Sequence, residues 1–597
     1  MFYNPLDKFY KSITGAVSDA DKVIFRVKGN FDSVILRIKK DGDFYRDYKM
    51  FALNGYFEYE LNFSVGLYFY HFYIGDGKFI GLGGDYEGII TDCPTDFQIT
   101  SYLDGYNVPE ILYGGIIYQI FPDRFCRFSE EKTVENGKTY HTNWNDIPEF
   151  LPKQGKILNN DFFGGDLKGI ESKISYLKEL GVTAIYLNPI FRAYSNHRYD
   201  TGNYMEIDSL LGNENDLISL ISNAEKSGIK IILDGVFNHT GADSVYFNKF
   251  GNYNSVGAYQ SKNSKFFNWY SFKSYPNEYE SWWGIDTLPS INEQDLDFID
   301  FITGKDGVIE KYTKMGVSGW RLDVVDELPD FFVEKIRGAV KRNNSQAVLI
   351  GEVWEDATNK IAYSKRREYF WGNGLDSVMN YPLKNAILEY VKTGNEKSLS
   401  FTIKEQIDHY PEIALHSLMN VLSTHDTYRL ISALGDLDVS GLSKADMSKV
   451  VLVGDNYKDA KIKVKIASLL QYTLCGVPSI YYGDEIGMQG YSDPLNRQGF
   501  SWNNIDNELL EWFKFLGRLR ADYSALSRCE FKEIYMKHGA FIYTRSDENS
   551  EIMPAVNLGS NELNLDFDGT LKDLISGKIY KNGVVLKKEA FYVFVAC

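Results

Sequence analysis

The segment from Gly319 to Glu327 holds a cation and a carboxylate at a spacing that suits covalent catalysis. Arg321 and Asp323 lie two residues apart in what reads as the end of a strand, so both side chains point to the same side. A guanidinium beside a carboxylate favours the ionised form, which a nucleophile requires. Taken alone, the pair is explained equally well as a surface ion pair.

Similar polar residues follow other apolar runs of the chain. They are His197 and Tyr199 after 182–187, Asp234, Asn238 and His239 after 229–233, Glu352 after 347–350, His425 and Asp426 after 418–422, and Asp493 and Arg497 after 476–482. Each has a structural explanation of its own, such as a loop cap, a solvated strand end or a hydrogen-bonded imidazole. Several strands of one sheet that each end in such a residue predict one shared polar site.

The polar clusters contain several carboxylates and no cysteine, a combination that suits the cleavage of an acetal. A glycosidic bond is cut by one carboxylate as nucleophile and a protonated carboxylic acid for the departing oxygen. Asp323 is the candidate nucleophile, and Glu352, with Trp354 two residues on, is the candidate acid. We expect Asp426 to hydrogen-bond sugar hydroxyls, together with His239 and His425.

Eight apolar runs alternate with helical patterns from about residue 111. This order predicts a (β/α)8 barrel, in which chemistry lies at the carboxyl ends of the strands. The expected strands are 115–121, 182–187, 229–233, one ending at Arg321, 347–350, 375–379, 418–422 and 476–482. Between them, Ile170, Ile174, Leu177 and Leu180 share one helical face.

The rest of the chain divides around this barrel. Residues 1–110 and 526–597 read as short strands separated by turns, which predicts a β-sandwich domain at each end. The barrel domain then covers 111–525. The segment 240–293 is rich in Asn, Ser, Tyr and Trp, and predicts an inserted loop domain beside the site.

Composition limits the classes of partner. A net charge of −17 disfavours nucleic acid and anionic membranes, which require clustered cations. No run approaches the ~20 apolar residues of a membrane span. The opening residues lack a basic segment followed by an apolar one, so we expect a cytoplasmic protein. Five scattered cysteines without a Cys-x-x-Cys pair indicate neither a zinc site nor a disulfide framework.

Four of the polar clusters, in their order along the chain, resemble the signature regions of the α-amylase superfamily, glycoside hydrolase family thirteen. They are 234–239, 319–323, Glu352 and 425–426. The segments 162–167, 196–201 and 493–497 are similar to those of its neopullulanase, cyclomaltodextrinase and amylopullulanase branch. The N-terminal sandwich also resembles that branch, whose members often dimerise through it.

The resemblance implies a retaining hydrolase of α-1,4-linked glucans such as starch, pullulan, maltodextrins or cyclodextrins. It implies that Asp323 is the nucleophile, Glu352 the acid/base and Asp426 the transition-state stabiliser. The implied substrate-binding residues are His197, Tyr199, Asp234, Asn238, His239, Arg321, Trp354, His425, Asp493 and Arg497. Trp282 and Trp283 are expected on the leaving-group side, and Asp326-Glu327-Leu328-Pro329 resembles enzymes that also open α-1,6 bonds.

No cofactor is expected. Relatives often bind calcium through an Asn- and Asp-rich loop after the first strand, but here that loop, Arg124 to Glu131, lacks those residues. Asp166 is the remaining acid that could hold an ion.

Three other functions fit parts of the pattern. One is a glucanotransferase or branching enzyme of the same fold, in which a sugar hydroxyl replaces water. Another is a non-catalytic carbohydrate-binding relative, which the presence of all three acids disfavours. The third is a metal-dependent barrel hydrolase, which would require His-x-His after the first strand, where this chain has Gln119 and Asp123.

Overall fold

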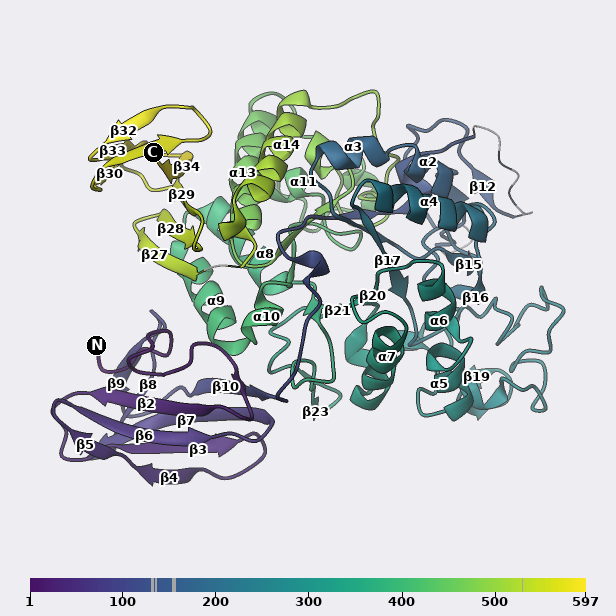
Figure 1. The fold of residues 1–597 in the computed structure, drawn as a ribbon. Coiled ribbons are helices and arrows are strands. Elements are labelled where there is room, and N and C mark those ends of the chain that lie inside the picture. Colours follow the sequence, from purple (N-terminus) through teal and green to yellow (C-terminus); the bar gives the residue numbers. More distant parts are fainter. Residues whose placement is uncertain (130–131, 133, 135–136, 153–156, 529) are drawn as a thin grey trace.

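The computed structural model consists of a barrel with surrounding helices and two β-rich parts on one side of it, the N-terminal part at the lower left and the C-terminal part at the upper left of Figure 1. It describes the chain except residues 130, 131, 133, 135, 136, 153–156 and 529. Of the quoted loop after the first barrel strand, Glu130 and Glu131 therefore lie outside the described residues.

The barrel is an eight-stranded parallel sheet in the order β24-β21-β20-β17-β14-β11-β26-β25. Its strands are β11 Ile117–Ile120, β14 Ala184–Leu187, β17 Lys230–Gly235, β20 Gly319–Leu322, β21 Val348–Gly351, β24 Ser377–Val378, β25 Met419–Val421 and β26 Val477–Tyr481. A bridge between Met379 and Met419 joins the two ends of the sheet. All eight predicted strands are confirmed, with ends that differ from the predicted ones by up to two residues.

The barrel strands are apolar along their whole length because both of their faces are buried. Alternate side chains such as Ile117, Ala184, Ile232 and Val348 fill the interior. The others pack outward against the surrounding helices. These helices are α2 Leu167–Glu171, α3 Ile174–Glu179, α4 Glu214–Lys226, α5 Leu296–Thr303, α6 Val308–Lys314, α7 Asp330–Asn343, α8 Tyr381–Thr393, α9 Glu396–His409, α13 Gly454–Thr473 and α14 Asn507–Asp522.

The helical pattern from Ile170 to Leu180 forms two short helices, α2 and α3, instead of one. Ser172 ends the first, and its hydroxyl donates to the carbonyl of Gly169 at 2.7 Å. A serine hydroxyl that bonds to the backbone in this way competes with the continuing helix. The apolar face is nevertheless kept, since Ile170, Ile174 and Leu177 are all buried.

The N-terminal part has two sheets. One follows the order β1-β10-β7-β3-β4, with β8 and β9 added, and the other is β2-β6-β5. The shorter strands are β1 Val17–Ser18, β4 Arg46–Lys49, β5 Phe51–Leu53, β8 Lys78–Leu82 and β9 Gly88–Thr91. The predicted strands correspond to β2 Lys22–Lys28, β3 Ile35–Lys40, β6 Tyr56–Asn62 and β7 Gly66–Gly75. Their inward residues form a separate apolar core that includes Phe25, Leu36 and Phe72. The last strand, β10 Phe97–Tyr102, leads toward the barrel.

The segment after β17 contains short elements, η2 Phe267–Trp269, β18 Phe272–Ser274, β19 Glu278–Tyr279 and η3 Trp282–Gly284. Aromatic packing holds it together: the Phe247 ring lies 4.8 Å from that of Tyr270 and 4.7 Å from that of Tyr279.

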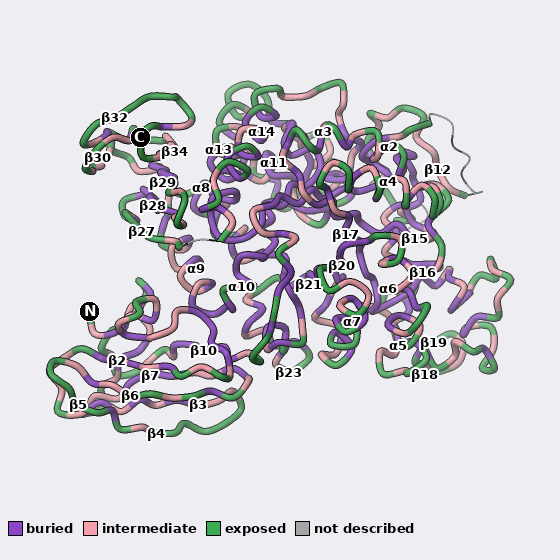
Figure 2. Tube along the Cα trace, in the orientation of Figure 1, coloured by how far each residue is buried: buried purple, intermediate pink, exposed green. Residues whose placement is uncertain are grey.

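At the C-terminal end, a six-stranded sheet in the order β27-β28-β29-β34-β31-β32 is joined by the pair β30-β33. The strands of the six-stranded sheet are β27 Glu530–Lys537, β28 Ala540–Ser546, β29 Glu551–Asn557, β31 Thr570–Asp573, β32 Ile579–Lys581 and β34 Ala590–Ala596. The pair is β30 Leu563–Leu565 with β33 Val584–Leu586. Both its core and that of the N-terminal part lie apart from the barrel interior (Figure 2). We propose that the domains meet near residues 110 and 525, with the inserted domain at about 240–293.

Candidate active site

A cleft of about 860 Å³ opens where the barrel strands end at their carboxyl termini. Most of the residues predicted for the site line it, namely His197, Tyr199, His239, Asp323, Glu352, Trp354, His425, Asp426, Asp493 and Arg497. The other three, Asp234, Asn238 and Arg321, are buried and do not line the cleft. Acids distant in sequence thus meet in one place.

Arg321 lies beneath the cleft and binds three carboxylates. Its Nη1 is 2.8 Å from Asp323 Oδ1 and 2.9 Å from Asp234 Oδ1, and its Nη2 is 2.7 Å from Glu352 Oε2. The guanidinium is fully buried. A planar cation with two nitrogens facing the site fixes these acids relative to one another.

The environment of Asp323 differs from the isolated ion pair that the sequence indicated. Burial raises the pKa of Asp323 well above its usual range, Arg321 opposes this, and the charges of Glu352, Asp234 and Asp426 add to the rise. One guanidinium faces several acids, so the group of carboxyls retains a proton more readily than a single carboxylate would.

Glu352 is oriented by groups on both sides. The backbone N–H of Val324 donates to its Oε2 at 2.9 Å, and the indole N–H of Trp354 donates to its Oε1 at 3.2 Å. Val324 has the left-handed φ of 38°, an uncommon value for a β-branched residue. The Trp354 ring stacks on that of Tyr381 at 3.9 Å and is 44% exposed. Tyr381 was not predicted, because an aromatic residue beginning a helix has no distinctive pattern.

Asp426 faces the cleft beside Arg497. The Arg497 Nη2 is 3.2 Å from Asp426 Oδ1, and its Nε donates to the carbonyl of His425 at 2.9 Å. The Asp426 side chain is 33% exposed to the cleft, but the surrounding protein partly desolvates its carboxyl group. This desolvation raises the pKa of Asp426 to about 6, against the charge of Arg497 and with that of Glu352.

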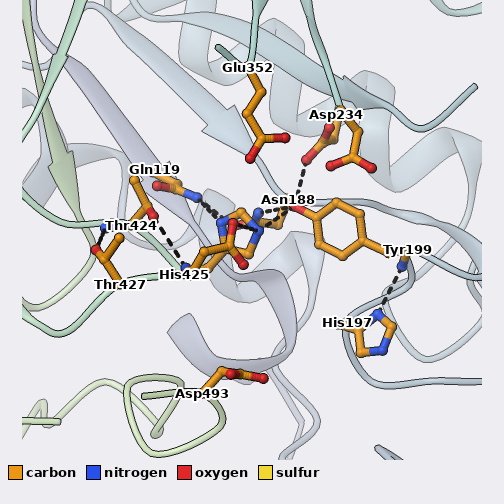
Figure 3. A network of polar contacts seen from close by, with 12 residues as sticks. Gln119, Asn188, His197, Tyr199, Asp234, Glu352, Thr424, His425, Thr427 and Asp493 are labelled. Atoms are coloured by element: carbon orange, nitrogen blue, oxygen red, sulfur yellow. Dashed lines mark hydrogen bonds and ion pairs between the residues drawn. The ribbon is translucent and has the colours of Figure 1, made fainter. Parts of the chain in front are cut away.

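His425 belongs to a network of buried polar groups (Figure 3). The amide Nε2 of Gln119 lies 2.9 Å from His425 Nδ1, so Nδ1 accepts and Nε2 carries the hydrogen. His425 Nε2 then donates to the Tyr199 hydroxyl at 2.7 Å, and Tyr199 donates to Asp234 Oδ2 at 2.9 Å. Burial, reinforced by Arg497 and Arg321, lowers the pKa of His425, which keeps the ring neutral.

Three members of this network were missed as site residues. Asn188 donates to Tyr199 at 2.9 Å, Tyr186 donates to Asp234 at 2.6 Å, and Gln119 bonds to His425. The sequence did offer a signal for these residues: each is polar and lies within an otherwise apolar barrel strand or directly after one. Buried polar groups need hydrogen-bond partners, so such positions indicate a polar network.

Two further histidines line the cleft. His197 Nδ1 accepts from the backbone N–H of Tyr199 at 3.1 Å, and burial, together with Arg497, lowers its pKa to about 3. The His239 ring stacks on Trp282 at 5.4 Å, and burial lowers its pKa to about 4. His239 Nε2 has no partner among the described residues, so it is available to a ligand. Asn238 lies behind it, 3.2 Å from His239 Nδ1.

The inserted segment and a hairpin after β21 meet at Glu327. The Trp283 indole N–H donates to Glu327 Oε1 at 3.2 Å, and the Tyr363 hydroxyl donates to Oε2. The side chains of Trp283 and Tyr363 are 78% and 66% exposed. Neither Glu327 nor Tyr363 was predicted to be a site residue.

Two acidic positions in the described part of the chain bear on metal binding. Asp166 caps α2 and lies 2.7 Å from the ammonium of Lys132, so its carboxylate is already paired. Asp356, Glu405 and His409 have ligand atoms within 4.8 Å of one another. His409 Nδ1, however, is hydrogen-bonded to Asp356, and calcium prefers six or more oxygen ligands. This group does not fit calcium.

An eight-stranded barrel with several acids at the carboxyl ends of its strands is the arrangement of barrel glycoside hydrolases. A family model, "Alpha amylase, catalytic domain", matches residues 119–518, and the chain belongs to this family. No helix in the described part of the chain has the length and apolar character to span a membrane.

Several curated proteins are similar. An amylopullulanase of Thermoanaerobacter thermohydrosulfuricus is 33% identical over 90% of this chain and 40% of its own length. A cyclomaltodextrinase of a Bacillus species is 31% identical over 77% of this chain and 76% of its own length. This chain spans only 34–50% of the length of the amylopullulanases that it matches.

Solved structures share the fold. The type III pullulan hydrolase from Thermococcus kodakarensis superposes with a TM-score of 0.70 over 100% of both chains, at 24% identity. A protein from Thermus thermophilus gives a TM-score of 0.67 and 29% identity over 81% of this chain and 100% of its own. These comparisons agree with the predicted fold class and family.

Proposed function

We propose that the chain is a retaining hydrolase of α-1,4-glucosidic bonds in maltodextrins, starch, pullulan or cyclodextrins. The observation that carries this proposal is the meeting of Asp323, Glu352 and Asp426 at one cleft. Contact of Asp323 and Glu352 with the same guanidinium favours the short carboxyl spacing of retaining enzymes. The names of the relatives, amylopullulanase and cyclomaltodextrinase, support this substrate class.

In the first step, an Asp323 carboxylate oxygen forms a bond to the anomeric carbon. The bond between that carbon and the glycosidic oxygen breaks, and Glu352 gives its proton to the departing oxygen. In the second step, Glu352 takes a proton from water, whose oxygen replaces Asp323 on the anomeric carbon. Two inversions at one carbon leave its configuration unchanged.

The remaining residues are proposed to hold the sugar. Asp426 would accept hydrogen bonds from its hydroxyls, and His239 Nε2, which has no described partner, would bind another. Tyr199 and Trp354 line the cleft and offer aromatic surfaces to the rings on either side of the scissile bond. Asp234, Asn238 and Arg321 lie below, where they would act through their neighbours.

Asp326 and Glu327 line the cleft, and the resemblance of 326–329 to enzymes that also open α-1,6 bonds supports cleavage of such bonds as well. The alternative, a glucanotransferase, shares the covalent intermediate and differs only in the acceptor. Product profiles on starch, pullulan and β-cyclodextrin test the proposal, with the anomeric configuration followed by NMR. Inverted products would contradict it, and products longer than maltotriose from maltotriose would favour transfer.

We also propose a homodimer through the N-terminal domain. The support is exposed apolar side chains of this domain. Phe51 and Leu53 of β5 Phe51–Leu53 are 70% and 46% exposed, and Phe44, in the turn after β3, is 94% exposed. Light scattering on the purified chain tests it, and a monomer at micromolar concentration would contradict it. The cytoplasmic location stays a prediction, which cell fractionation tests.

A further inference from the structure

The loop between β21 and β24 carries the proposed acid/base. Glu352, Trp354, Glu355 and Lys360 of this loop line the cleft. Its regular structure is limited to a small hairpin, β22 Ile361–Ala362 with β23 Lys365–Arg366. Because most of the loop lies outside regular structure, contacts from other parts of the chain help to fix its position.

Asp356 faces away from the cleft and organises the rear of this loop. Its Oδ1 accepts from the N–H and the hydroxyl of Thr358 at 2.9 and 2.8 Å. Its Oδ2 accepts from His409 Nδ1 at 2.6 Å and from Asn359 Nδ2 at 3.3 Å. Burial acts to raise the pKa of Asp356, but the hydrogen bond and charge of His409 hold that pKa below its usual range. The carboxylate thereby joins the loop to the end of α9.

Gln98 of strand β10 continues this connection into the N-terminal domain. Its Nε2 donates to the hydroxyl of Thr358 at 2.8 Å, and its Oε1 accepts from Asn359 Nδ2 at 2.8 Å. The Gln98 side chain is buried at 4% exposure. The side-chain amide of Gln98 therefore bonds to two consecutive residues of the loop, through its nitrogen as donor and its oxygen as acceptor.

A second contact from the same domain reaches the hairpin. The guanidinium of Arg366 binds both carboxylate oxygens of Asp41. Its Nε donates to Oδ2 at 2.8 Å, and its Nη2 donates to Oδ1 at 3.2 Å. Asp41 belongs to the turn after β3. The two contacts attach the loop to the N-terminal domain at residues 358–359 and at residue 366.

We propose that Gln98 and Asp356 are positioning residues, which aim Glu352 and Trp354 by fixing the rear of the loop against the N-terminal domain. This inference rests on the proposed function of Glu352. A general acid must lie within hydrogen-bond reach of the glycosidic oxygen, and displacements near 1 Å can cost up to about 100-fold in rate. The N-terminal domain is then a working part of the catalytic site.

The test compares two substrates that differ in their need for a proton. Gln98→Ala should lower kcat on maltodextrin by about tenfold. An aryl maltoside with a good leaving group should lose less than about threefold, since its departure requires little proton transfer. Asp41→Ala, at a more exposed position, should act in the same direction and more weakly. Thermal unfolding verifies that each variant is folded at the assay temperature.

Tyr113→Phe is the matched control. It removes a hydrogen bond between the segment before the barrel and the carbonyl of Ile413, at 2.8 Å, away from the loop. We expect its ratio of rates on the two substrates to equal that of the wild type. Equal losses on both substrates in Gln98→Ala, or no loss on either, would overturn the inference. An inactive wild type would instead contradict the proposed function.

Discussion

The backbone N–H of Val324 donates a hydrogen bond to the carboxyl group of Glu352 at 2.9 Å. Val324 directly follows Asp323, so the backbone that carries the proposed nucleophile also orients the proposed acid. Val324 itself has a left-handed φ of 38°. Strained backbone of this kind persists only where the surroundings enforce it. The two proposed catalytic acids are therefore mechanically linked.

Asp323→Ala should lower the rate on maltodextrin by about 10⁴-fold or more, because the covalent intermediate is lost. Steady-state kinetics measure this. Glu355→Gln, at another acid that lines the same cleft, is the control and should retain most of the activity. Near-normal turnover by Asp323→Ala would remove Asp323 from the role of nucleophile.

Glu352→Gln should act selectively. It leaves the hydrogen bond from Val324 in place but supplies no proton, so maltodextrin cleavage should fall by about 10²-fold or more. Aryl glucosides with good leaving groups should be cleaved at rates closer to those of the wild type. Comparable losses on both substrates would contradict the acid role.

Trp354→Phe separates two contributions of this side chain. A phenyl ring keeps the stacking on Tyr381 but removes the donor to Glu352, and we expect about a fivefold loss in kcat. Trp354→Ala should also raise KM for maltodextrin, because the aromatic surface is lost. Identical kinetics for the two variants would show that stacking is not used.

Trp283→Ala should raise KM for amylopectin or pullulan by about threefold to tenfold, because the exposed indole at Glu327 offers a stacking surface to the leaving chain. Maltotriose, which is shorter, should be affected less. Phe250→Ala is the matched control: Phe250 is 58% exposed in the same inserted segment but does not line the cleft. A similar change in both variants would argue against the proposed contact.

Glu485 makes stability depend on pH. Burial raises its pKa from 4.5 to about 7, against hydrogen bonds from Tyr118 and Tyr176. A raised carboxyl pKa stabilises the folded state fully below about 4.5, and this contribution, about 3 kcal/mol, is lost as the pH rises to 7. Denaturant unfolding at pH 5 and pH 7.5 should show a smaller decrease in Glu485→Gln than in the wild type. An equal decrease would exclude Glu485 as its source.

Much of the architecture follows from local sequence. Barrel strands buried on both faces leave continuous apolar runs, and the acids that follow Leu322 and Gly351 lie where such runs end. The division into α2 and α3 was not predicted. The spacing of apolar residues shows which side of a helix is buried, but it does not show where the helix is interrupted.

Long-range polar contacts could not be predicted in the same way. Glu327 bonds to Trp283 and Tyr363 from two separate loops, and neither loop has a period that fixes its path. The pairing of Arg321 with Asp323 was visible, but not that Asp234 and Glu352 share the same guanidinium. Such contacts arise only once the barrel has closed.

The closure of the barrel at Met379 and Met419 is confined to one bridge, whereas neighbouring strands elsewhere, such as β14 and β17, pair over four residues. Local opening of a fold begins where the fewest backbone hydrogen bonds must break. This bridge lies between β24 and β25. β24 is the neighbour of β21, which precedes Glu352, and β25 precedes Asp426. Local opening of the barrel would therefore move Glu352 away from Asp426 before it displaces Asp323. Backbone amide hydrogens near Met379 and Met419 should then exchange faster than those of the other barrel strands.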